Sequence, residues 1–174
     1  MAGAIERLAR WLALAGGLAL VAMIIMTVAS IVGRSLISFG LGPVPGDFEL
    51  IEIGTGFAVF AFLPWCQLRR GHATVDIVTN YFSHRANHII DLVTEILLTI
   101  TIVVITWRLW VGMMDKIRYN ETTFILQWPV WWGYAAALVA AVGGVIVSFY
   151  MVFVRWQELR RNRDLLPPAE GAMH

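Results

Sequence analysis

Cysteine, charge and polar sequence are all scarce in this chain. It has one cysteine, Cys66, in 174 residues, which excludes an internal disulfide framework and any cysteine-rich metal or iron–sulfur site. Only 14% of the residues are charged and the formal net charge is +1, so nothing indicates nucleic-acid binding. The sequence contains no glycine-rich phosphate loop, no nucleophile–base pair and no metal-spaced cluster. We therefore expect no catalytic residue, no bound cofactor and no enzyme activity.

Apolar residues, by contrast, are abundant. They make up 59% of the chain, and its mean hydropathy is +0.71. A soluble domain is typically about 45–50% apolar and about 25% charged. A water-soluble fold of this size could not hide so much apolar surface, so the composition indicates a protein whose solvent is lipid.

Four stretches of the sequence can cross a membrane. A hydrocarbon core about 30 Å thick requires about 20 apolar residues in a helix. The four stretches cover about residues 11–33, 48–68, 88–111 and 129–154. The first follows Arg7 and Arg10 and could be a signal peptide, but its uncharged run exceeds the usual apolar segment of about 7–15 residues. We predict an all-α integral membrane protein of four transmembrane helices, with residues 1–155 as the membrane domain and 156–174 as a short tail.

Lysine and arginine are unevenly divided between the two sides of these spans. Four of the thirteen flank one side. The other nine flank the side that holds both termini, and they are Arg7, Arg10, Arg69, Arg70, Arg85, Arg155, Arg160, Arg161 and Arg163. Because cytoplasmic flanks carry an excess of these residues, we predict that both termini are cytoplasmic.

Ionisable residues near the outer ends of the spans indicate ion pairs. Arg34 closes the first span, and we expect it to pair with Glu49 or Glu52, which share one face of the second helix. Arg108 lies near the outer end of the third span and could pair with Glu52 or Glu121. Asp47 precedes the second helical run as an expected N-cap.

A second group lies at the inner ends. Asp91 and Glu95 share one face of the third span, at the depth of Arg69 and Arg70. A proton or cation relay is the alternative reading of these carboxylates, but a relay needs titratable groups spaced through the membrane, and these cluster at its two faces. We predict structural ion pairs or contacts with a partner subunit.

The histidines test for a haem-binding membrane anchor. His72 and His84 lie in the predicted loop, His88 at a span boundary and His174 at the last residue. Haem b in such anchors is held between histidines buried in facing helices, and the sequence offers no such pair. His84 and His88 could bind a metal ion if helical, but solvated histidines fit the sequence better.

The last span carries small residues at four-residue steps. Ala136, Ala140, Gly144 and Ser148 form a stripe that would let another helix approach closely. Gly16 and Gly17 in the first span and Gly54 and Gly56 in the second add further close-packing surfaces. Together these surfaces suggest a further membrane partner.

Four short motifs occur in an order that resembles a known family. They are VGRSL at the end of the first span, PVPGDFELIEI at the start of the second, RRGHATVDIV in the following loop and NETTFILQWPVWW before the last span. The chain resembles, from about Trp11 to Arg155, the small membrane subunit of tripartite ATP-independent periplasmic (TRAP) transporters, the DctQ-like family.

This resemblance implies a function and its partners. The expected role is a scaffold that braces a large multi-span membrane subunit during sodium-coupled uptake of an organic acid. The substrate would be delivered by an extracytoplasmic binding protein, and the chain would lie in the bacterial inner membrane. The alternative is a membrane anchor subunit of a respiratory or other enzyme, and a free-standing small carrier or channel is a third reading. By position, His72 and Asp76 belong to the family's cytoplasmic His/Asp motif, and we expect Asp76 to cap the segment after it.

Overall fold

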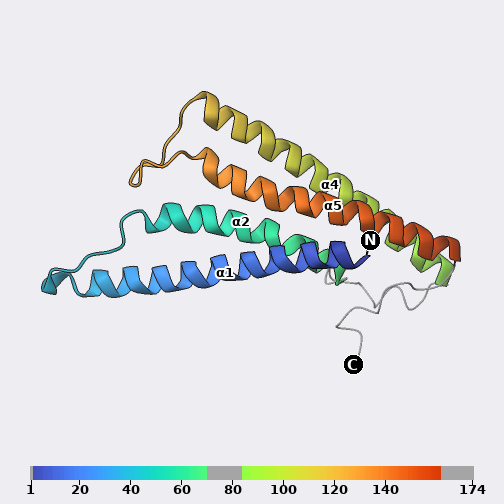
Figure 1. Ribbon diagram of the computed structural model, residues 1–174, viewed down its shortest axis with the longest axis horizontal. Coiled ribbons are helices and arrows are strands. Elements are labelled where there is room, and N and C mark those ends of the chain that lie inside the picture. The colour runs from blue at the N-terminus through green and yellow to red at the C-terminus, as the bar shows by residue number, and fades with distance from the viewer. Residues whose placement is uncertain (1, 70–83, 162–174) are drawn as a thin grey trace.

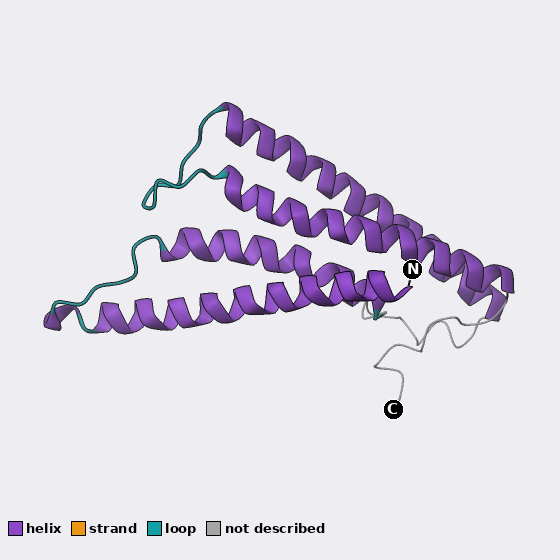
Figure 2. Cartoon of the chain, viewed as in Figure 1, coloured by secondary structure: helices purple, strands orange, loops and turns teal. Residues whose placement is uncertain are grey.

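The computed structural model describes residues 2–69 and 84–161, and this part of the chain is almost entirely helical. Its elements are α1 (Ala2–Ser35), the short 3₁₀ helix η1 (Ile37–Phe39), α2 (Asp47–Leu68), α4 (His84–Arg118) and α5 (Trp131–Arg161), as Figures 1 and 2 show. All four α-helices are long and apolar enough to cross a membrane. The predicted all-α protein with four spans is therefore confirmed.

Most helix ends lie outside the predicted span ends, although α2 ends at Leu68 as predicted and α5 begins at Trp131, two residues after the predicted start at 129. α1 begins at Ala2, α4 begins at His84 and ends at Arg118, and α5 continues six residues past 155 into the predicted tail. The sequence pattern marks where lipid contact ends, because charged residues interrupt the apolar run there. Arginine, glutamate and lysine are nevertheless good helix formers, so the helices continue through them into the flanking polar sequence.

The four helices form two antiparallel pairs. α1 packs along α2, α4 packs along α5, and the pairs join mainly through α2 and α5, with a smaller contact between α1 and α5. Figure 1 shows the pairs close together where α1 begins and diverging toward the connections at residues 36–46 and 119–130. We call the side with these connections the loop end, and the opposite side the terminal end.

α5 is the central helix of the bundle. Half of its most apolar stretch is buried, against 6% of that of α1. Its buried side chains are mostly small, and they include Ala137, Ala140, Ala141 and Ser148. Small side chains bring the helix backbones close together, which strengthens dispersion contacts where lipid gives no hydrophobic drive for association.

The predicted small-residue stripe faces the interior of this chain. Ala140, Gly144 and Ser148 are buried and Ala136 is half-buried. A Cβ atom added to Gly144 would lie 3.8 Å from Cγ of Pro64 in α2 and 3.9 Å from Cγ2 of Ile102 in α4. The stripe thus lies where α2, α4 and α5 meet.

The other small-residue surfaces are used only in part within the chain. A Cβ on Gly16 of α1 would lie 3.0 Å from the Cβ of Ala61 in α2, and a Cβ on Gly54 would collide with Met23. Gly16 and Gly54 therefore explain how α1 and α2 pack. A Cβ on Gly17 or Gly56 would meet nothing within 4 Å, so the further membrane partner that the sequence suggested stays a prediction.

α4 and α5 continue together past the end of α2. Gln67, next to the last residue of α2, contacts Glu95 and Ser148, which lie 11 residues after the start of α4 and 13 before the end of α5. At 1.5 Å per residue the pair extends about 17–20 Å beyond α2. We call residues 84–94 of α4 and 149–161 of α5 the α4–α5 extension, which is visible in Figure 1.

We predict that Ala140→Leu lowers the free energy of unfolding by about 1–3 kcal/mol, because overpacking a filled interior forces neighbouring side chains and backbones to shift. Ala140 is fully buried, whereas its neighbour Val139 is 69% exposed. Val139→Leu is therefore the control and should leave stability unchanged. The thermal unfolding midpoint in detergent measures both, and equal midpoints for the two variants would contradict the central position of α5.

Candidate functional site

A group of buried polar side chains joins three helices near the terminal end. The Gln67 side chain of α2 accepts a hydrogen bond from the Ser148 hydroxyl of α5 at 2.8 Å, and its amide nitrogen donates to the Glu95 carboxylate of α4. Gln67 is 2% exposed, Ser148 is fully buried and Glu95 is 8% exposed. We call these three residues the Gln67 junction. Every member is bonded to another member, as burial away from water requires.

An ion-pair group lies beside it in the α4–α5 extension. The Nη1 atom of Arg155 in α5 is 2.8 Å from Oδ2 of Asp91 in α4 and 3.2 Å from Oε2 of Glu158 in α5. Glu158 is fully buried and Arg155 is 8% exposed. Because a buried carboxylate is costly without a cation, Arg155 makes burial of Glu158 feasible. The pairing also holds α4 against α5 beyond the end of α2.

The sequence identified the acidic residues here but missed Arg155 and Gln67 as their partners. Asp91 and Glu95 were expected near Arg69 and Arg70. Asp91 pairs with Arg155 and Glu95 bonds Gln67, while the Arg69 guanidinium stacks 4.6 Å from the Trp65 ring. Arg70 lies outside the described residues.

Ser30, Arg34 and Asp47 connect α1 to α2 at the loop end. The Ser30 hydroxyl donates to Oδ2 of Asp47 at 2.6 Å, and Nη2 of Arg34 lies 3.9 Å from the same oxygen. Arg34 therefore pairs with Asp47, and the expected pairing with Glu49 or Glu52 is wrong. Asp47 is also the first residue of α2 rather than its N-cap, although its Oδ1 accepts the Phe48 N–H at 2.9 Å. The register of α2 against α1 places the carboxylate of Asp47 beside α1, rather than the carboxylates of Glu49 and Glu52.

Glu49 has a different contact, with the connection between α4 and α5. Its two carboxylate oxygens accept the backbone N–H groups of Ile125 at 2.7 Å and Leu126 at 3.0 Å. That connection is a narrow hairpin closed by a bridge between Thr122 and Pro129. We call this contact the Glu49 clasp. It ties the first turn of α2 to the α4–α5 pair at the end where the two pairs diverge.

The remaining charges at the loop end pair locally or stay exposed. Lys116 Nζ lies 2.6 Å from Oε2 of Glu121, so Lys116, and not Arg108, is the partner of Glu121. Arg108 is exposed and lies over the Trp107 ring at 6.0 Å. Glu52 is exposed as well.

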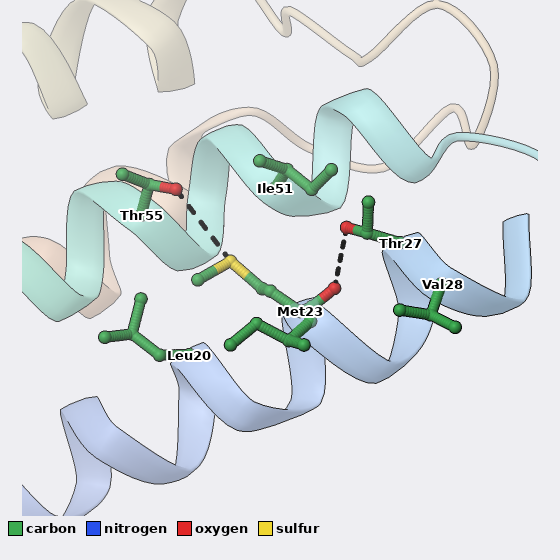
Figure 3. A pocket seen from close by; sticks show the side chains of 7 residues that line it. Leu20, Met23, Thr27, Val28, Ile51 and Thr55 are labelled. Atoms are coloured by element: carbon green, nitrogen blue, oxygen red, sulfur yellow. Dashed lines mark hydrogen bonds between the residues drawn. The ribbon is translucent and has the colours of Figure 1, made fainter. Parts of the chain in front are cut away.

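An apolar pocket of about 260 Å³ lies between α1 and α2 (Figure 3). Seven residues line it: Leu20, Met23, Ile24, Thr27, Val28, Ile51 and Thr55. Its two hydroxyls are already engaged within the chain, Thr27 with the Met23 carbonyl at 2.8 Å and Thr55 with the Met23 sulfur at 3.9 Å. The lining holds no charged group, so the pocket can accept hydrocarbon but offers no polar group to recognise a solute.

Within residues 2–69 and 84–161, no group of three or more histidine, cysteine, aspartate or glutamate side chains is placed to hold a metal ion. The polar groups described above instead make contacts within and between helices. The two bonded groups lie near the terminal end and the clasp at the loop end. Between them the described interior consists mainly of small and branched apolar residues.

Comparison with known proteins gives the family of this chain. The model of the DctQ component of tripartite ATP-independent periplasmic transporters matches residues 23–158. The chain belongs to the DctQ family. A search of curated proteins and a search of solved structures each gave no match. The family match confirms the resemblance found in the sequence. Together with the four apolar helices, it makes the chain a transporter component and a multi-pass membrane protein.

The predicted His/Asp motif of this DctQ chain, His72 and Asp76, lies outside the described residues. The capping role of Asp76 therefore stays a prediction. His88 is described and is 6% exposed. The expectation of a solvated histidine is therefore wrong at this position.

Sequence reasoning missed Gln67 and Arg155 as interhelical residues, and it missed the buried Glu158 that Arg155 binds on its own helix. Arg155 was assigned to the cytoplasmic flank because it follows the apolar run. One available signal was Glu158, which lies at i, i+3 from Arg155 and so shares its helix face. Another was Gln67, an amide within the last turn of an otherwise apolar helix, since such residues bond across helices in membranes.

We predict that Arg155→Met destabilises the folded DctQ chain by about 3 kcal/mol or more, since it leaves the buried Glu158 without this cation. Arg161→Met, an exposed arginine on the same helix, is the matched control. Unfolding midpoints in detergent compare the two, and the double variant Arg155→Met/Glu158→Gln should recover part of the loss. An Arg155→Met protein as stable as the control would contradict the ion-pair role.

We also predict that Glu49→Ala loosens the hairpin between α4 and α5. Removing the carboxylate leaves the Ile125 and Leu126 amides without their acceptor, so their hydrogen exchange should become several-fold faster. Exchange followed by mass spectrometry on peptides covering residues 121–130 gives the readout. Glu52→Ala, one turn later on α2, should change nothing, and equal exchange in both variants would rule out the clasp.

Proposed function

We propose that this chain is the scaffold subunit that braces the large membrane subunit of a TRAP transporter. The assembly takes up an organic acid with sodium ions, and an extracytoplasmic binding protein delivers the acid. The chain lies in the bacterial inner membrane with its terminal end, and therefore both termini, on the cytoplasmic side. The DctQ family supports the class of transporter, and the features below support the bracing role.

The observation that carries the bracing role is how the polar side chains are used. Gln67, Glu95 and Ser148 bond one another, Arg155 binds two carboxylates, and Glu49 is bonded to the backbone. A relay would require ionisable groups at intervals through the bundle. The interior between the two ends is instead lined by residues such as Ala58, Ala61, Ala140 and Ile102. This arrangement favours a static bundle over a conducting one.

Surface composition supports a role beside another membrane protein. α1 exposes apolar residues along its whole span, and α4 exposes a face that runs from Ile89 to Trp110. Helices with such exposed apolar faces are stable only in lipid or against another protein. These faces therefore support a position in the bilayer where another membrane protein can cover part of them.

We predict that the chain, expressed with the genes around it and extracted gently, copurifies with a single large multi-span protein in about a one-to-one ratio. Size-exclusion chromatography and mass spectrometry identify the partner. In proteoliposomes, the pair with the binding protein should accumulate the organic acid under a sodium gradient, and this chain alone should not. A chain that purifies alone with a haem or quinone spectrum would support the enzyme-anchor alternative, and flux through this chain alone would support a free-standing carrier.

A further inference from the structure

Four polar residues of α4 recur at every seventh position. They are Thr94, Thr101, Arg108 and Asp115, and all four are exposed. We call them the heptad stripe. Apolar side chains flank the stripe and are themselves exposed, with Leu97 60% and Val104 48% accessible.

The heptad stripe lies on the side of α4 away from the bundle. The buried residues of this helix, among them Glu95, Thr99, Ile102 and Met113, form a different face. A seven-residue repeat is the spacing at which one helix meets another in a left-handed pair, in membranes as in water. In a straight helix such a stripe drifts by about 20° per repeat, and a partner helix that winds around it follows that drift.

Arg108 is the residue in the stripe that lipid accommodates least. It is the only ionisable residue of α4 between Glu95 and Asp115. It lies three residues before the predicted end of the third span at 111, about 5 Å along the helix axis. In the described part of the chain its guanidinium lies 6.0 Å from the centre of the Trp107 ring, and no carboxylate lies within ion-pair distance. A charge inside a span is costly and usually faces protein or water.

α1 gives the comparison that distinguishes a lipid-facing surface from a docking surface. Its exposed residues from Trp11 to Val32, such as Leu18, Ile24 and Ile25, are apolar, and the sequence between them carries no charge. Lipid solvates such a face without penalty. The exposed face of α4 has the same apolar flanks but adds two hydroxyls and a guanidinium within the span.

We infer that the heptad stripe of α4 is the docking surface for a transmembrane helix of the large membrane subunit, which places a carboxylate opposite Arg108. The inference rests on the proposed scaffold function and specifies its interface. The Thr94 and Thr101 hydroxyls donate to the carbonyls of Ile90 and Leu97, both at 2.9 Å, so their donors are satisfied before docking. Short threonine side chains permit close approach of a second helix. The positive charge of Arg108 favours a docking helix that carries a carboxylate at that level.

Site-specific photo-crosslinking in the intact complex tests the surface. A photoreactive amino acid is placed at Thr101 or Val104 on α4, and at Leu18 or Ile25 on α1 as exposed controls. We expect the two α4 positions to link to the large subunit and the two α1 positions to link to lipid only. Links to the large subunit from α1 alone, or links between two copies of this chain at Thr101, would overturn the inference. The wild-type complex must copurify first, so a failure of the scaffold function is seen separately.

Substitution of the arginine tests the charge. Arg108→Leu should lower the yield of the copurified complex at least about tenfold, because the carboxylate opposite it loses its cation. Arg108→Glu should lower it further, and Arg118→Leu, an exposed arginine at the end of the same helix, should leave it unchanged. Because Arg108 is exposed, the variant chain alone should stay monodisperse with an unchanged unfolding midpoint. An unchanged yield with Arg108→Leu would show that Arg108 contacts lipid phosphate instead and would overturn the inference.

Discussion

The hydrogen bonds of the Gln67 side chain fix the arrangement of three helices. Lipid offers no donor or acceptor, so a polar side chain inside a span must find its partners in the protein. Gln67 bonds α4 through Glu95 and α5 through Ser148, which sets the axial position of α2 against both. Since α2 ends one residue later, the same contact determines how far α4 and α5 project beyond it.

The two ends of the bundle and its middle are held by different forces. Small residues of α5 give close apolar packing in the middle, where polar groups would be costly. Polar contacts act at the ends, through Arg155 on one side and the Glu49 clasp on the other. The clasp is needed where it occurs because the helix pairs diverge there, and packing alone joins them less. The molecule therefore resists both sliding and opening of its two helix pairs.

The sequence was sufficient for the spans and the family but not for most of the pairings. A span is a property of one continuous stretch, and its length and apolarity can be read directly. A pairing depends on the register between two helices, which no single stretch contains. Arg34 shows this, since its partner is Asp47 rather than the glutamate two residues later. Arg155 shows it as well, because the end of its apolar run suggested water, whereas α4 shelters it in the extension.

The unequal lengths of the helices make the chain sensitive to the thickness of its membrane. α2 has 22 residues and is about 33 Å long, whereas α4 has 35 and is about 53 Å long. Hydrocarbon about 30 Å thick matches α2 standing upright, but α4 must tilt or emerge from it. Each ångström of hydrophobic mismatch costs a fraction of a kcal/mol. A thicker bilayer therefore covers more of the α4–α5 extension, and lipid composition becomes a variable that sets how the two helix pairs sit in the membrane.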